Sequence, residues 1–356
     1  MSWLEPADSG FALRFASFDG RSWSAARTIR SGRDFFVNWA DFPSIVVLGP
    51  KHLAAHWLQK TGGTSYAYGV RISQSRDGGA TWSAPVRPHT DSSDTEHGFV
   101  AMWREPQGLG AVWLDGRKFA KSGSGHDEHN PANEMTVVTT NLSATGARSA
   151  EVTVDARACD CCQTSAALTS DGPIVAYRDR SPDEIRDIYV VRRVRGKWTE
   201  PRAVHADNWN IAACPVNGPN VSASGRRVAL AWFTGARDTA RVKLAFSNDA
   251  GATFGAPVRI DGGAPAGRVD TELLPDGSAL VTWVERTGGD TAQVMLRRVR
   301  ADGSAGSPVS IASSTAQRAS GFPRMVIAGE YAYFAYTQPG RPSQVKFARL
   351  AWKDVR

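Results

Sequence analysis

The sequence has no long apolar run. Across 356 residues, no uninterrupted apolar stretch approaches the roughly 20 residues that a helix needs to cross a bilayer. The first residues, Met1-Ser2-Trp3, also lack the charged and apolar segments of a secretion signal. We therefore expect a soluble protein without a membrane span. It is either periplasmic or secreted with its signal already removed, or cytoplasmic.

Runs of basic residues are absent too, although 42 basic residues against 35 acidic ones give a net charge of +7. Lys and Arg are spread along the chain with no run of five or more. No basic stripe is interleaved with aromatic residues, so nucleic acid is not expected as a partner. The excess positive charge favours an anionic small molecule or glycan as the ligand of a monomeric protein.

What the sequence does contain is a repeat. Six β-rich runs each carry an aromatic residue near their end, and these residues are spaced by 51 to 64 positions: Trp57, Trp113, Tyr177, Trp232, Trp283 and Tyr336. A further candidate strand precedes each run and another follows it, with a fourth closing most units. Such units bury both faces only against neighbouring units, which predicts an all-β fold of six four-stranded antiparallel blades, a β-propeller.

One turn pattern occurs twice, as Ser75–Trp82 and Ser247–Phe254, each after the third strand of its unit. Both read Ser-x-Asp-x-Gly-x-Thr-aromatic, in which Asp bonds to nearby amides and Gly permits a positive φ. The pattern resembles the Asp box of the sialidase (BNR-repeat) superfamily. That resemblance implies a six-bladed propeller, with the turns on the face opposite the active site.

The chain ends determine how the predicted ring closes. The last unit has only three candidate strands, so residues 23–30 are expected to supply its fourth strand within a single domain covering residues 1–356. Residues 11–16 read as an additional strand for which this scheme has no place.

The face opposite the two turns carries the candidate catalytic residues. In an antiparallel unit, the start of the first strand and the loop after the second strand share one face. Acidic and basic side chains gather at these positions and could line an axial pocket. The candidates are Asp41, Glu96, Asp270, Glu272, Arg178, Arg237 and Arg324.

The resemblance to sialidases implies roles for these residue types. Those enzymes hold the substrate carboxylate with three arginines and use a Tyr nucleophile backed by Glu, with an Asp as acid and base. Arg178, Arg237 and Arg324 are the expected clamp, and Tyr66 or Tyr68 the expected phenol. The family's first arginine has no counterpart, because the corresponding stretch Asn38–Pro43 contains none.

Cysteine is scarce, and its placement supports a second interpretation. The four cysteines fall at the starts of two consecutive units, as Cys159, Cys161 and Cys162 and then Cys214. With His97, His126 and His129 from the preceding unit, Cys161, Cys162 and Cys214 could bind Cu or Zn. Disulfides are the alternative and fit an exported protein. Three functions therefore remain open: an exo-sialidase-like glycoside hydrolase or binder of acidic glycans, a metal-binding or thiol-redox protein, and a non-catalytic binding propeller.

Overall fold

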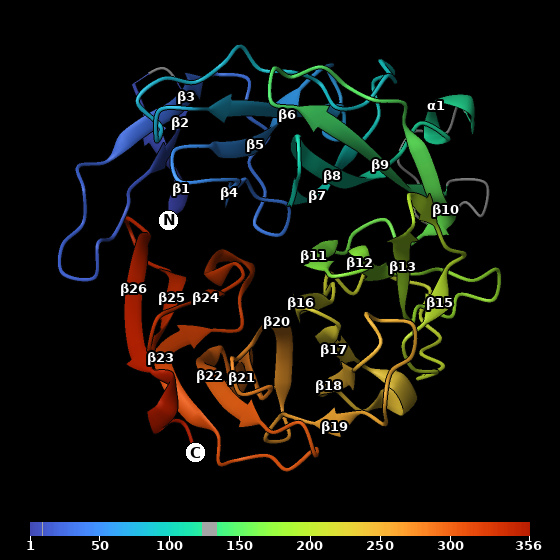
Figure 1. Ribbon diagram of the computed structural model, residues 1–356, viewed down its shortest axis with the longest axis vertical. Helices are drawn as coiled ribbons and strands as arrows, with labels where there is room; N and C mark the ends of the chain where they lie inside the picture. The colour runs from blue at the N-terminus through green and yellow to red at the C-terminus, as the bar shows by residue number, and fades with distance from the viewer. Residues whose placement is uncertain (9, 123–133) are drawn as a thin grey trace. The chain divides into compact units, whose positions relative to one another are not determined.

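The computed structural model describes residues 1–8, 10–122 and 134–356, and almost all regular structure in it is β (Figure 1). Its strands form seven antiparallel sheets, the blades of a β-propeller. The sequence predicted six blades, and this number is wrong. The chain divides into two compact units, Met1–Asp160 and Cys161–Arg356, which are described one at a time.

The first unit contains three sheets, each a meander of strands that follow one another in the chain. The sheets are β1 (Ser2–Ala7), β2 (Gly10–Phe15) and β3 (Arg27–Gly32); β4 (Ser44–Val47), β5 (Leu53–Lys60) and β6 (Tyr68–Ser75); and β7 (His97–Glu105), β8 (Gly108–Asp115), β9 (Met135–Ser143) and β10 (Val152–Ala158). A short helix, α1 (Phe119–Ser122), follows β8.

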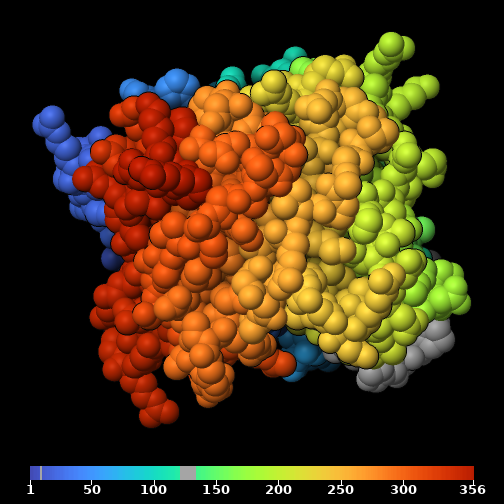
Figure 2. Space-filling model, turned by 90° about the horizontal axis from the view of Figure 1, so that it is seen from below, coloured from blue at the N-terminus to red at the C-terminus, as the bar shows by residue number. Residues whose placement is uncertain are grey.

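The second unit contains four sheets of the same kind. Its strands are β11 (Ser165–Thr169), β12 (Gly172–Arg178), β13 (Ile188–Val194), β14 (Lys197–Trp198) and β15 (Arg202–Ala203); β16 (Asn220–Ser224), β17 (Arg227–Thr234), β18 (Arg241–Ser247) and β19 (Val258–Arg259); β20 (Pro265–Leu273), β21 (Ala279–Gly288), β22 (Thr291–Val299) and β23 (Val309–Thr315); and β24 (Arg324–Ala328), β25 (Tyr331–Gln338) and β26 (Gln344–Ala351). Short 3-10 turns lie at Ala236–Asp238, Arg318–Ser320 and Trp352–Asp354. In Figure 2 its later sheets, from yellow to red, cover the surface side by side.

The seventh sheet is the first in the chain. Residues 11–16, which had no place in the six-bladed scheme, fall largely within β2, the central strand of this sheet. Residues 23–30 do not complete the last blade, because β3 pairs with β2 and the last sheet keeps three strands. β2 ends in the buried Phe15, which takes the place of the periodic aromatic residue in this sheet. Phe15 and Trp57 are 42 residues apart, which is less than the spacing between the aromatic residues of the other units, so the repeat did not reveal this sheet.

The periodic aromatic residues pack between blades, as the repeat predicts. Trp113, Trp232 and Trp283 are among the largest fully buried side chains. An indole N–H in such a place needs an acceptor. Trp113 donates to Asp115 at 2.9 Å and Trp232 donates to Asp207 at 2.7 Å.

The two repeated turns have the same hydrogen bonds. In the first, Ser75 Oγ accepts the Gly79 N–H at 2.7 Å, and Asp77 accepts the Thr81 N–H at 2.9 Å. In the second, Ser247 Oγ accepts the Gly251 N–H at 2.9 Å, and Asp249 accepts the Thr253 N–H at 2.9 Å. The second turn follows β18, whereas Cys161 precedes β11. Within the second unit these are opposite ends of the meanders, as expected.

A recurring hydrogen bond joins the first strands of neighbouring sheets. A side-chain oxygen on or just before the first strand of one sheet accepts a main-chain N–H on or just before the first strand of the next, and we call this contact the inter-sheet latch. The latch pairs are Asp41 with Phe99, Gln163 with Gly218, Ser165 with Val221, Asn217 with Arg268, Asn220 with Thr271, Ser222 with Leu273, and Asp270 with Met325. Asp41 and Asp270, which the sequence marked as candidate functional residues, therefore also hold neighbouring blades together.

Candidate functional site

A phenol lies between two carboxyl groups in the first unit. Tyr68 is the first residue of β6, Glu96 immediately precedes β7, and a parallel bridge joins these two positions. The Tyr68 hydroxyl donates to Glu96 and lies 3.1 Å from Asp41 Oδ2. All three side chains are buried. We call Asp41, Tyr68 and Glu96 the tyrosine–carboxyl cluster.

The backbone around the cluster is shaped to admit Asp41. Phe99 has a φ of 54°, and its N–H donates to Asp41 Oδ1 at 2.8 Å. A Cβ on Gly98 would lie 2.0 Å from Asp41 Oδ2 and 2.9 Å from the Tyr68 ring, so a side chain at this position would displace the carboxyl group. On its other side the Tyr68 ring stacks on Phe36, with centroids 3.8 Å apart.

Burial controls protonation in the tyrosine–carboxyl cluster. It raises the pKa of Asp41 to about 7, although the Phe99 N–H and the Tyr68 hydroxyl oppose the shift. Burial also raises the pKa of Tyr68 well above its usual value, and the charges of Glu96 and Asp41 add to this. The phenol has one proton and donates it to Glu96. Protonated Asp41 can then donate to the phenol oxygen.

A second acidic cluster lies in the second unit. Asp270 and Glu272 are both on β20, and Arg324, half exposed at the start of β24, brings its Nε to 3.3 Å from Asp270 Oδ2. Glu272 accepts the Ser222 hydroxyl at 3.0 Å. Burial, reinforced by the charge of Asp270, raises the pKa of Glu272 to about 7. Asp270, Glu272 and Arg324, three of the candidates marked in the sequence, therefore lie close together.

The other two candidate arginines have different surroundings. Arg178 is fully buried, and its guanidinium group donates to the main-chain oxygens of Asn217, Phe233 and Arg186. Arg237 lies in an exposed turn that lines a cavity of about 320 Å³. The three arginines expected to form one clamp thus have separate sets of contacts, and Arg178 is a structural residue.

His97 has partners within its own unit. Its ring stacks on His89 with centroids 4.1 Å apart, and its Nε2 lies 3.1 Å from Asp91 Oδ2. Burial and the charge of His97 lower the pKa of His89 to about 3. His126 and His129, the other predicted histidine ligands, lie outside the described residues.

Cys159, Cys161 and Cys162 occupy the turn between β10 and β11, where their sulfur atoms lie close together. Cys214 precedes β16. Sequence reasoning left Cys159 out of the ligand set, although its spacing of two residues from Cys161 was a signal for it.

No protein-family model and no curated protein sequence matches the chain. Solved structures do match. The α-L-arabinanase of Penicillium chrysogenum, complexed with arabinobiose, has a TM-score of 0.55 at 14% identity over 89% of this chain and 94% of its own. A Hadza microbial sialidase has a TM-score of 0.55 at 11% identity, over 99% of this chain and 75% of its own. The sialidase of Trypanosoma rangeli has a TM-score of 0.57 at 12% identity, over 98% and 59%.

These matches establish likeness of fold. The chain is a sialidase-like propeller whose solved neighbours include glycoside hydrolases. The described residues contain no helix that is both long enough and apolar enough to cross a bilayer.

Proposed function

We propose that the protein is a glycoside hydrolase and that the tyrosine–carboxyl cluster carries its chemistry. The observation that supports this most directly is the Tyr68 hydroxyl, which donates to Glu96 and lies 3.1 Å from Asp41. The glycoside hydrolases among its structural neighbours supply the reaction class. Glu96 and Asp41 were predicted as catalytic from the sequence, and Tyr68 was one of the two predicted phenols.

The pKa shifts assign the roles. Because the pKa of Tyr68 is raised, the phenol stays protonated at rest and becomes a nucleophile only as Glu96 accepts its proton. Asp41, with a pKa of about 7, is partly protonated at neutral pH and can act as an acid. Phenol, base and acid therefore come from three neighbouring positions in one unit.

The reaction takes two steps. In the first, the Tyr68 oxygen bonds to the anomeric carbon, its proton passes to Glu96, and Asp41 protonates the departing glycosidic oxygen. In the second, Asp41 removes a proton from water, the water oxygen bonds to the anomeric carbon, and the phenol leaves and regains its proton from Glu96. Both groups return to their starting protonation states, and the anomeric configuration is retained.

The net charge of +7 favours an acidic glycan as substrate. Arg178 does not support a carboxylate clamp, since its donors bind main-chain oxygens. The test therefore uses fluorogenic sialosides and arabinosides side by side.

Wild-type protein is expected to turn over at least one member of this panel. Tyr68→Phe and Glu96→Gln are each expected to lower kcat by about 10²-fold to 10⁴-fold, since proton transfer is lost. Tyr66→Phe is the matched control, because Tyr66 is 42% exposed and two residues away, and it should retain full activity. Circular dichroism checks that each variant is folded. Turnover by folded Tyr68→Phe equal to wild type, or no turnover of any member by wild type, would overturn the proposal.

A further inference from the structure

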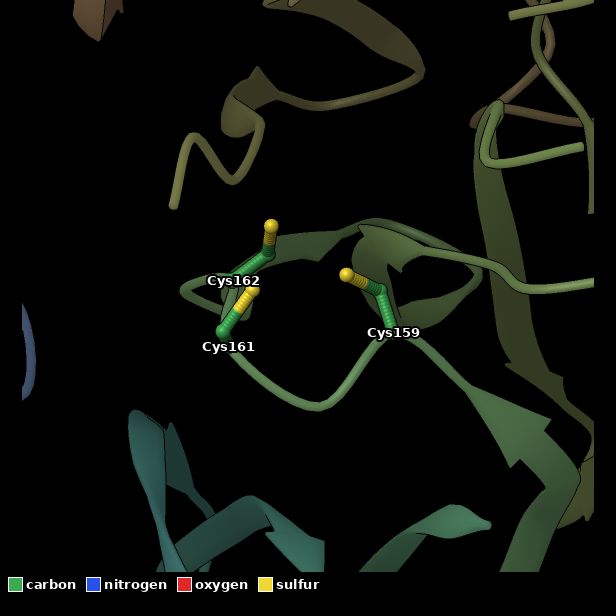
Figure 3. Close-up of side chains that lie close together, drawn as sticks. All are labelled: Cys159, Cys161 and Cys162. Atoms are coloured by element: carbon green, nitrogen blue, oxygen red, sulfur yellow. The ribbon is translucent and has the colours of Figure 1, made fainter. Parts of the chain in front are cut away.

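Three thiol groups meet in one turn of the chain. The sulfur atoms of Cys159, Cys161 and Cys162 lie within 4.8 Å of one another, and Figure 3 shows the three side chains close together in this turn. The turn connects the end of β10 to the start of β11, and the three cysteines lie within four consecutive positions of it, so this proximity is a property of local chain geometry. Cys159 and Cys162 are buried and Cys161 is half-buried.

A fourth thiol reaches the same turn from further along the chain. The sulfur atoms of Cys161 and Cys214 and a carboxylate oxygen of Asp160 form a second group within 4.8 Å. Cys161 belongs to both groups. The sulfur atoms of the other three cysteines and one carboxylate oxygen thus lie close to the half-buried Cys161, and these four cysteines are all that the chain contains.

The two loops that carry these thiols are fixed to each other. The Gly218 N–H donates to Gln163 Oε1 at 2.9 Å, which is one of the inter-sheet latches. A Cβ on Gly218 would lie 2.1 Å from the Gln163 main-chain oxygen, so the segments after Cys162 and Cys214 touch backbone to backbone. This close contact orders the sulfur atoms before any ligand arrives, which lowers the entropic cost of binding.

Packing alone does not explain this arrangement. A buried cysteine often serves as a small apolar side chain, but that role does not require three sulfur atoms to converge. Thiolates at Zn–S distances of about 2.3 Å lie roughly 3.8 Å apart in a tetrahedral site. Small side-chain rotations would therefore bring sulfur atoms that are up to 4.8 Å apart to the separations of a metal site. All four cysteines are thiols in this structure.

We propose that Cys159, Cys161 and Cys162 bind one soft d10 metal ion, Cu(I) or Zn(II), through their thiolates. Three thiolates satisfy Cu(I), whereas Zn(II) takes a fourth ligand; Cys214 lies near Cys161 but outside the group that Cys159, Cys161 and Cys162 form. Binding releases the thiol protons and adds no redox step. Compared with the ligand set expected from the sequence, Cys159 replaces the histidines, since His97 is held by Asp91 and His89.

The first experiment measures metal content and thiols in full-length protein purified without chelator under reducing, anaerobic conditions. We expect one equivalent of Cu or Zn per chain by elemental analysis. Metal-free protein should regain one equivalent when titrated with Zn(II), or with Cu(I) against a competing chelator. The stoichiometry and affinity of the two titrations distinguish the ions. Alkylation under native conditions should modify fewer thiols in metal-bound than in metal-free wild-type protein, a readout that needs no variant.

Variants locate the ion. Cys161→Ser and Cys162→Ser should each weaken metal binding by about 100-fold or more, because each removes a direct ligand. His205→Ala is the control, since an imidazole that is 39% exposed is a common adventitious ligand and its loss should leave one equivalent bound. Co(II) should give thiolate-to-cobalt charge-transfer absorption in wild type and lose it in Cys161→Ser.

Two results would overturn the proposal. The first is no free thiol in denatured protein from a parallel purification without reductant, together with no bound metal, which would show that the four cysteines form two disulfides. The second is four reactive thiols with no metal-dependent protection from alkylation. Neither result bears on turnover by the tyrosine–carboxyl cluster, so this proposal and the proposed hydrolase activity can fail independently.

Discussion

Asp41 accepts the Phe99 N–H on one oxygen and lies beside the Tyr68 hydroxyl with the other, and solvent reaches almost none of it. A carboxylate in such a place loses hydration that two hydrogen bonds only partly replace, so its neutral form is favoured. The same residue thus serves as an inter-sheet latch and as a candidate acid. These roles are compatible, because the latch uses Oδ1 and the acid uses Oδ2.

The raised pKa of Asp41 makes stability depend on pH. Between the unfolded pKa near 4 and the folded pKa of about 7, the folded protein holds a proton that the unfolded chain has lost. The contribution of Asp41 is therefore most favourable below pH 4 and declines as pH rises toward 7 and above. Asp41→Asn keeps an acceptor for Phe99 and a donor for Tyr68 without ionising.

Urea unfolding at pH 5 and pH 8 tests this. From pH 5 to pH 8, the free energy of unfolding of wild type should fall by roughly 1 to 3 kcal/mol more than that of Asp41→Asn. Glu272→Gln serves as a comparison, since the pKa of Glu272 is also raised to about 7 and its removal should act in the same direction. If wild type and Asp41→Asn lose the same free energy, Asp41 is not a titrating group in this window.

At the scale of elements, the two repeated turns show which local features a sequence specifies. Ser75 and Ser247 each accept a glycine N–H four residues on, and Asp77 and Asp249 each accept a threonine N–H four residues on. All partners lie within eight residues, so the motif determines the geometry. The inter-sheet latches could not be predicted in this way, because Asp41 and Phe99 are 58 residues apart and their meeting depends on how whole blades pack.

The equivalence of the two turns gives a prediction. Ser75→Ala and Ser247→Ala should each lower the free energy of unfolding by about 1 to 2 kcal/mol, because each leaves a buried glycine N–H without its acceptor. Exposed Ser307→Ala is the control and should change it by less than about 0.5 kcal/mol. Thermal or urea unfolding measures all three. If Ser75→Ala and Ser247→Ala lose no more unfolding free energy than Ser307→Ala, these turns do not stabilise the blades.

At the scale of the molecule, the repeat predicted the propeller class and six of its seven sheets. The first sheet was not predicted as a blade. Its aromatic residue is Phe15 rather than Trp or Tyr, and the shorter step to Trp57 broke the period. Leu13, Phe35 and Trp57 form a buried cluster that joins this sheet to the second. Of the candidate residues, Asp41 and Glu96 lie beside Tyr68, whereas the guanidinium group of Arg178 donates to main-chain oxygens; their catalytic roles stay predictions.

If the first sheet is a full blade, its core residues should matter as much as any others. Leu13 is 1% exposed, and Leu13→Ala should cost about 2 to 5 kcal/mol of unfolding free energy. Leu168→Ala is the control, because Leu168 is 46% exposed and its truncation should cost little. If Leu13→Ala and Leu168→Ala lose equal unfolding free energy in urea, the N-terminal sheet is peripheral to the fold.

The most direct test of the proposed hydrolase is to trap its intermediate. A glycoside with fluorine at the carbon next to the anomeric centre and a good leaving group forms the glycosyl–enzyme and hydrolyses it slowly, because fluorine destabilises the positive charge of both transition states. After proteolysis, mass spectrometry should locate one sugar on the Tyr68 hydroxyl, with none in Tyr68→Phe. A stable adduct on any other residue, or inhibition by a substrate analogue with no adduct at all, would contradict the assignment of Tyr68 as nucleophile.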